Sequence, residues 1–122
     1  MHVKSDTKEK FHAITVLDAA LSATMTEEMG QTFLAYLDRE PRNLVLNMNQ
    51  VQSIDLPAAE KLVTLQQRFY EHSRSFVICC LQKPVEQFLD ENELLEIMNV
   101  TPTESEAWDI VQMEEIEREF LD

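Results

Sequence analysis

Three short apolar runs set the strongest limit on how this chain can fold. They read "KFHAITVL" at 10–17, "NLVLNMNQV" at 43–51 and "SFVICCL" at 75–81. The first two alternate as strands do, and the third is apolar on both faces, as in a central strand. The stretches between them space their apolar residues as helices do. This order is typical of an α/β layer domain whose crossovers are right-handed.

The helical stretches begin with recognisable start signals. Thr24 with Glu27 fits a capping box at the start of the first helix, which Pro41 closes. Thr103 with Glu106 fits a second capping box before the last helix. We expect most apolar residues of that last helix to lie in the core, namely Ala107, Ile110, Val111, Met113 and Phe120.

The remaining elements complete the order of the fold. Pro84 opens a third helix, after which Asn92 predicts a left-handed turn in place of glycine. The run at 99–101 is long enough only for an edge strand. The segment "MHVKS" at 1–5 predicts a weaker strand. The predicted order is therefore β-β-α-β-α-β-α-(β)-α, as a single α/β domain over residues 1–122.

The junction "SIDLPAAEKL" at 53–62 joins the second apolar strand to the second helix. Pro57 suits the first helical position, which makes Leu56 the cap residue. Leucine cannot accept a hydrogen bond through its side chain. Asp55 is therefore the nearest group able to offset the positive end of the helix.

Composition excludes several classes of site. Gly30 is the only glycine, so the chain has no Gly-rich phosphate loop. No apolar stretch approaches the length of a membrane span, and the N-terminus has no apolar core of a secretory signal. The adjacent Cys79 and Cys80 predict reduced thiols in a cytoplasmic protein. The three histidines are scattered, and we predict no metal and no cofactor.

Charge is concentrated at one end of the chain. Residues 1–85 carry ten acids and nine bases, whereas residues 86–122 carry thirteen acids and one base, Arg118. The net charge of −13 repels phosphate backbones, which argues against nucleic acid or an anionic membrane as a partner. The acidic end is either a solvated surface or a docking face for a basic partner.

Three segments together resemble the STAS domain. "NLVLNMNQVQSIDLPAAEKL" is similar to the family's strand, apolar–Asp step and helix, and "ALSATMTEEM" is similar to its Gly-x-Leu-Asp loop. "LLEIMNVTPTESEAWDIV" resembles its late segment. The family includes anti-sigma-factor antagonists and the cytoplasmic tails of sulfate transporters. The resemblance implies a four- to five-stranded mixed sheet packed against about four helices.

The chain departs from the family at the regulatory site. Antagonists carry Asp-Ser-Ser-Gly or Asp-Ser-Thr-Gly, and a kinase phosphorylates the second hydroxyl. Here the segment 55–58 reads Asp-Leu-Pro-Ala, so Pro57 occupies the phosphoacceptor position. The Gly-x-Leu-Asp loop reads Ala-Ala-Leu-Ser at 19–22, so its glycine and its acid are both replaced. The resemblance therefore implies a domain without the usual serine switch and with no phosphosite at Pro57.

We expect a non-enzymatic interaction module that binds a partner protein, either an anti-sigma factor or kinase-like protein or a transporter component. The alternatives are a regulatory subunit of a lipid-transport ABC complex, a sensor of an apolar small molecule, or an enzyme using Asp55 as a base. A further alternative is that the 53–62 junction has no role beyond starting its helix. A homodimer is left open. The hypothetical partner interface comprises Ser22, Thr24, Ser53, Asp55, Leu56, Pro57, Ala58 and Glu60.

Overall fold

A computed structural model describes residues 1–121. Its main sheet has five strands in the order β1-β2-β4-β6-β7. β1 is antiparallel to β2, and the remaining neighbours are parallel. The predicted mixed sheet is confirmed, and its strands are β1 (Val3–Thr7), β2 (Phe11–Val16), β4 (Asn43–Asn47), β6 (Phe76–Cys79) and β7 (Val100–Thr101).

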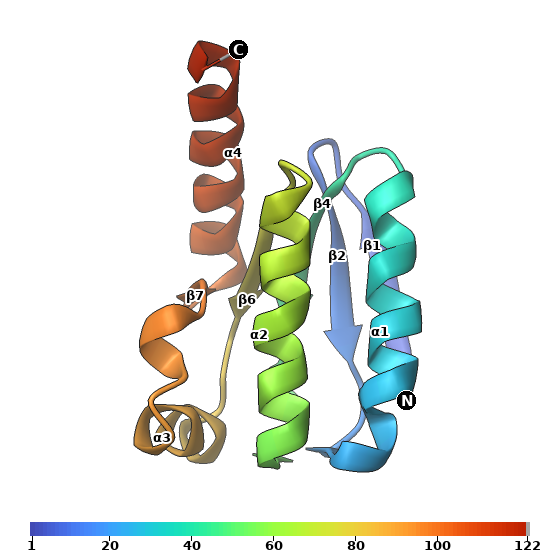
Figure 1. The fold of residues 1–122 in the computed structure, drawn as a ribbon, viewed down its shortest axis with the longest axis vertical. Helices are drawn as coiled ribbons and strands as arrows, with labels where there is room; N and C mark the ends of the chain where they lie inside the picture. Colours follow the sequence, from blue (N-terminus) through green and yellow to red (C-terminus); the bar gives the residue numbers. More distant parts are fainter. Residues whose placement is uncertain (122) are drawn as a thin grey trace.

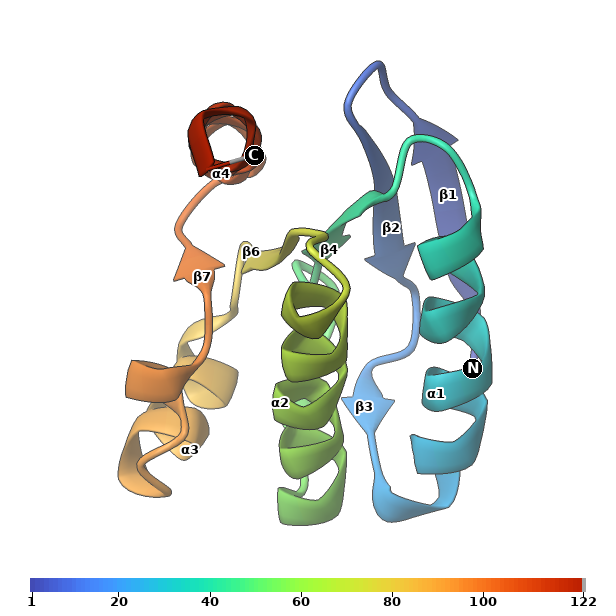
Figure 2. The same cartoon turned by 45° about the horizontal axis from the view of Figure 1, so that its top comes forward.

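Four helices cover the two faces of this sheet (Figure 1). Helices α1, α2 and α3 lie on one side, and α4 lies on the other (Figure 2). The helices are α1 (Thr26–Leu34), α2 (Leu56–Glu71), α3 (Lys83–Glu91) and α4 (Glu104–Leu121). Short 3-10 segments are η1 (Ala23–Met25), η2 (Ala35–Asp38) and η3 (Leu95–Ile97), and β3 (Ala20–Leu21) pairs with β5 (Ser53–Ile54) in a second, two-stranded sheet.

Strand alternation divides the core into two layers. Leu44 and Leu46 of β4 face α1 and α2, while Val45 faces α4. Phe76 of β6 packs edge-on against Phe69 of α2, with ring centroids 5.0 Å apart. Both faces of β4 and β6 are therefore buried, as expected for interior parallel strands.

The predicted capping box of Thr24 with Glu27 is wrong. The chain first makes the 3-10 segment η1, so α1 begins only at Thr26 and its cap residue, Met25, offers no side-chain acceptor. The Thr24 hydroxyl instead lies 3.0 Å from that of Ser22. The 3-10 turn takes up the residues that the sequence pattern assigned to the first turn of the helix.

Two further local predictions are corrected near the C-terminal end. Asn92 has a φ of −95°, and the left-handed residue is its neighbour Glu93, with a φ of 60°. Met113 and Phe120 of α4 are 52% and 86% exposed, so they lie outside the core. The second capping box is confirmed in part, since the Glu106 N–H donates to the Thr103 hydroxyl over 3.2 Å.

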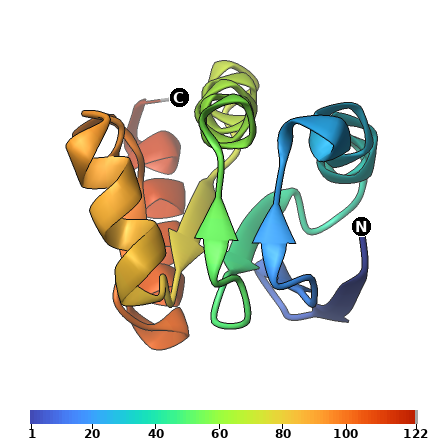
Figure 3. The ribbon, with the colours of Figure 1, turned by 90° about the horizontal axis from the view of Figure 1, so that it is seen from below.

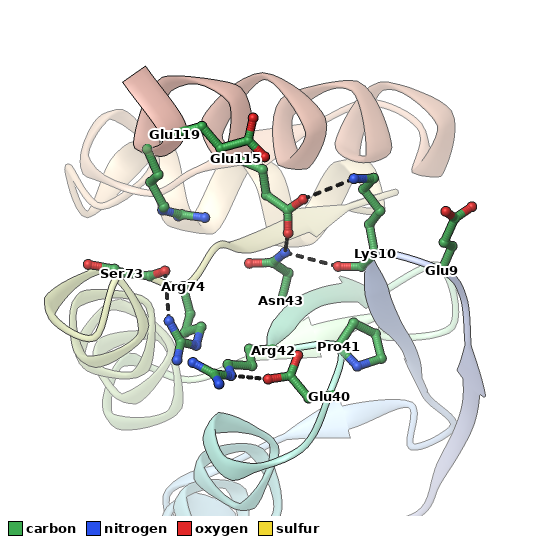
Figure 4. Close-up of a pocket in the computed structure, with 11 residues that line it drawn as sticks. Glu9, Lys10, Glu40, Pro41, Arg42, Asn43, Ser73, Arg74, Glu115 and Glu119 are labelled. Carbon is green, nitrogen blue, oxygen red and sulfur yellow. Dashed lines mark hydrogen bonds and ion pairs between the residues drawn. The ribbon is translucent and has the colours of Figure 1, made fainter. Parts of the chain in front are cut away.

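Polar contacts around Asn43 fix α4 at the end of the sheet where β2, β4 and β6 begin (Figure 4). The Asn43 Nδ2 donates to the Lys10 carbonyl over 2.9 Å and to Glu115 Oε1 over 2.6 Å. Its Oδ1 accepts from the Ser75 N–H over 2.8 Å. Arg118 of α4 donates to the Ser75 hydroxyl over 2.8 Å. One buried amide of β4 thus joins the residues just before β2 and β6 to helix α4.

Replacing Asn43 with Ala should lower the free energy of unfolding by about 2 kcal/mol, because it leaves buried donors and acceptors without partners. Urea denaturation measures this change. Asn49→Ala is the matched control, because Asn49 is exposed and its loss should change stability by under about 0.5 kcal/mol. Equal stability of the two variants would contradict the anchoring role of Asn43.

Candidate functional site

The two short strands β3 and β5 bring the 19–26 loop and the 53–62 junction together. They lie side by side where the blue strand leads to the first helix and the green strand to the second (Figure 3). The Gln52 N–H donates to the Ala19 carbonyl over 2.7 Å, and the Asp55 N–H donates to the Leu21 carbonyl over 3.1 Å. The two segments that resemble family motifs therefore form one continuous surface.

Asp55 links these two segments through its carboxylate. Its Oδ1 accepts from the Ala58 N–H over 3.1 Å, and its Oδ2 accepts from the Ala23 N–H over 2.8 Å. Asp55 has an extended backbone and is the cap residue of α2, so the prediction of Leu56 as cap is wrong. The helix starts at Leu56 because an aspartate oxygen can satisfy an otherwise unpaired helix N–H, which a leucine side chain cannot do.

The predicted interface residues differ in their access to solvent. Leu56 is 42% exposed, and Pro57 and Glu60 are exposed beside it on α2. On the neighbouring loops, Thr24 and Ser53 are exposed, whereas Ser22 and Asp55 are partly buried. Ala58 is 0% exposed and faces the core. The apolar part of this surface therefore consists of Leu56 and Pro57, without Ala58.

A shallow depression of about 590 Å³ lies between α1 and α2 beside Pro57. Lys61 and Thr64, one and two turns along α2 from Pro57, contribute to its lining, and α1 contributes Thr26 and Glu27. The Lys61 side chain crosses towards α1 and lies close to Gly30. A β-carbon added to Gly30 would come within 3.1 Å of the Lys61 Nζ. The sequence interpretation overlooked Lys61, although its i+4 spacing from Pro57 places both on one side of the helix.

The side chains of this surface offer polar and apolar contacts to a partner. Asp55 directs both carboxylate oxygens to backbone donors, which is the geometry of a helix cap. Within residues 1–121, no three His, Cys, Asp or Glu side chains are grouped as a metal site. Burial raises the pKa of the Cys79 thiol, so that thiol stays protonated at neutral pH.

Replacing Asp55 with Ala removes an acceptor for two backbone donors and should lower the free energy of unfolding by about 1–2 kcal/mol. Urea denaturation with a probe of tertiary structure measures the loss. Asp55→Asn keeps one side-chain oxygen and should retain a large part of the stability. If Asp55→Ala unfolds at the same urea concentration as the native chain, the carboxylate does not hold the two segments together.

Comparison with solved structures supports the same fold. An anti-sigma-factor antagonist (STAS) domain protein from Planctomyces limnophilus is 20% identical, with a TM-score of 0.76 over 90% of this chain and 97% of that one. An anti-sigma factor antagonist from Mycobacterium paratuberculosis is 13% identical, with a TM-score of 0.77 over 91% and 93%. The unphosphorylated anti-sigma factor antagonist SpoIIAA, known from Bacillus, is 13% identical, with a TM-score of 0.69 over 91% and 96%.

Sequence comparisons give two further results. No curated protein sequence matches the chain significantly. In the part of the chain that the structure describes, no helix combines the length and apolar character required to cross a bilayer. The family model of the STAS domain matches residues 4–107. This match includes all of the main sheet except Val3, both short strands and the Asp55 junction, and the chain therefore belongs to the STAS domain family.

Proposed function

We propose that this STAS domain is a protein-interaction module of the anti-sigma-factor-antagonist type, which binds its partner through the paired 19–26 and 53–62 segments. The observation that carries the proposal is the exposed Leu56 and Pro57 pair at the start of α2. Apolar side chains surrounded by polar ones are typical of protein interfaces. The polar surroundings are Ser22, Thr24, Ser53, Asp55 and Glu60.

A binding role fits the contacts of Asp55 better than an enzymatic one. A general base needs an oxygen within reach of a substrate proton, but here each carboxylate oxygen accepts a backbone N–H of the same chain. The carboxylate instead holds two loops in fixed relative positions. A surface whose loops are fixed before binding loses less conformational entropy when a partner docks.

We further propose that binding at this surface is independent of serine phosphorylation. SpoIIAA has been solved in a phosphorylated form, and the resemblance to the family implies that Pro57 stands where antagonists carry the modified hydroxyl. Proline has no hydroxyl that could accept a phosphoryl group. The partner class that we propose is an anti-sigma factor or kinase-like protein in the cytoplasm, where free thiols such as those of Cys79 and Cys80 persist.

Pro57→Asp should abolish co-purification of the partner with a tagged chain in the native host, because it puts a charge into the apolar part of the interface. Pro84→Asp is a closely matched control. Both prolines are exposed and lie at the second position of a helix, in α2 and α3 respectively. Equal recovery of the partner with both variants would place the interface elsewhere, provided that both melt within a few degrees of the native chain.

Incubation with ATP and a purified kinase of the anti-sigma-factor type should leave residues 53–60 without phosphate. Intact-mass and peptide mass spectrometry measure the outcome, with a serine-bearing antagonist as the positive control for the kinase. Ser53 is the nearest exposed hydroxyl on the same segment. Stoichiometric phosphate on Ser53 would show that the switch has moved along the chain instead of being lost.

A further inference from the structure

Helix α4 carries an apolar stripe on the side that faces away from the sheet. Met113, Ile116 and Phe120 are 52%, 53% and 86% exposed. Their spacing of three and four residues places them on one line along the helix. We call these three residues the outer stripe. The last turns of α4 project past the end of the sheet, so solvent reaches this part of the helix from several sides (Figure 1).

The opposite side of α4 is firmly attached to the body of the protein. Ala107 and Val111 are 0% exposed and belong to the second core layer. The Tyr70 hydroxyl donates to Glu114 over 2.8 Å, and Arg118 donates to Ser75 over 2.8 Å. These contacts fix the rotation of the helix, so the outer stripe stays on the surface and cannot turn into the core.

The charges beside the outer stripe are acidic. Asp109, Glu117 and Glu119 are exposed and lie three or four residues from members of the stripe, which makes them its neighbours on the helix surface. Helix α4 contains seven acids and one base in all. That base, Arg118, points inward to Ser75. The outer side of the helix therefore combines apolar contact area with negative charge.

This combination selects among the partners that could cover the stripe. A second copy of α4 would bring its own Asp109, Glu117 and Glu119 to the interface, and like charges in close contact weaken association. Nucleic acid and anionic membranes are repelled for the same reason. An amphipathic helix with an apolar side and flanking Lys or Arg residues complements both properties, because such a helix lays its apolar side against a matching surface.

We propose that the outer stripe is a second docking surface, which binds a basic amphipathic helix of a partner protein. It is separate from the Leu56 and Pro57 surface, and it does not depend on the function proposed for that surface. The apolar side of the partner helix covers Met113, Ile116 and Phe120. Its Lys or Arg side chains lie next to Asp109, Glu117 and Glu119.

The test uses the full chain and a designed probe. The probe is a fluorescein-labelled 18-residue peptide with Leu at helical i, i+3, i+4 and i+7 positions and Lys or Arg beside them. A second peptide has Glu in place of every Lys and Arg. Fluorescence anisotropy should show saturable binding of the basic peptide only. Raising the salt from about 50 mM to about 500 mM should weaken it several-fold, as screening of paired charges requires.

Two variants separate the apolar and charged contributions. The triple variant Met113→Ser, Ile116→Ser, Phe120→Ser should weaken binding by at least about tenfold, because it removes the buried contact area. The variant Asp109→Asn, Glu117→Gln, Glu119→Gln should bind less tightly and respond less to salt. The matched control is Glu86→Gln, Asp90→Asn, Glu91→Gln, which removes three exposed acids from α3 and should bind as the native chain does.

Three outcomes would overturn the proposal. The first is that the triple Ser variant keeps the native melting temperature and binds the basic peptide as tightly as the native chain does. The second is a dimer in sedimentation analysis that the triple Ser variant dissociates, because the stripe would then be covered by a second copy. The third is stripe-dependent binding to phosphatidylcholine vesicles without binding to the basic peptide, which would assign the stripe to a lipid surface.

Discussion

Burial of both faces of β4 and β6 is the constraint on which the rest of the structure depends. Leu44 and Leu46 need cover on one side, and Val45 and Val77 need it on the other. A sheet of this kind is stable only with helices on both faces. Helices α1 to α3 supply the first cover and α4 the second, which is why α4 must lie against the sheet for part of its length.

The same constraint determines where the surface residues gather. Parallel strands end at one edge of the sheet, and the loops that leave this edge carry the variable chemistry of α/β proteins. Here the loop after β2 contains β3, and the loop after β4 contains β5. The pairing of β3 with β5 and the Asp55 carboxylate join these two loops. Fixed loops on a rigid scaffold are well suited to recognition, because the scaffold keeps their geometry constant.

The strands at 10–17 and 43–51 could be predicted from sequence because their alternation is clear over six or more residues. The strand at 75–81 could be predicted because it is a short run that is apolar on both faces. The pairing of β3 with β5 could not, since two-residue strands show no periodicity. The restriction on the residue before a proline predicts Leu56 as the cap, but the side-chain acceptor of Asp55 sets the helix start one residue earlier. Sequence alone does not separate the buried apolar residues of α4, such as Val111, from the exposed ones, such as Met113. Helical spacing shows that apolar residues share a side but not which side meets the sheet.

The length of α4 has a geometric consequence for assembly. In the ribbon, β5 and the start of α2 lie near one end of the long axis, and the last turns of α4 lie at the other (Figure 1). A protein bound at one end would leave the other end accessible. If both proposed surfaces are occupied, the domain holds two partners at once, which raises the effective concentration of each near the other.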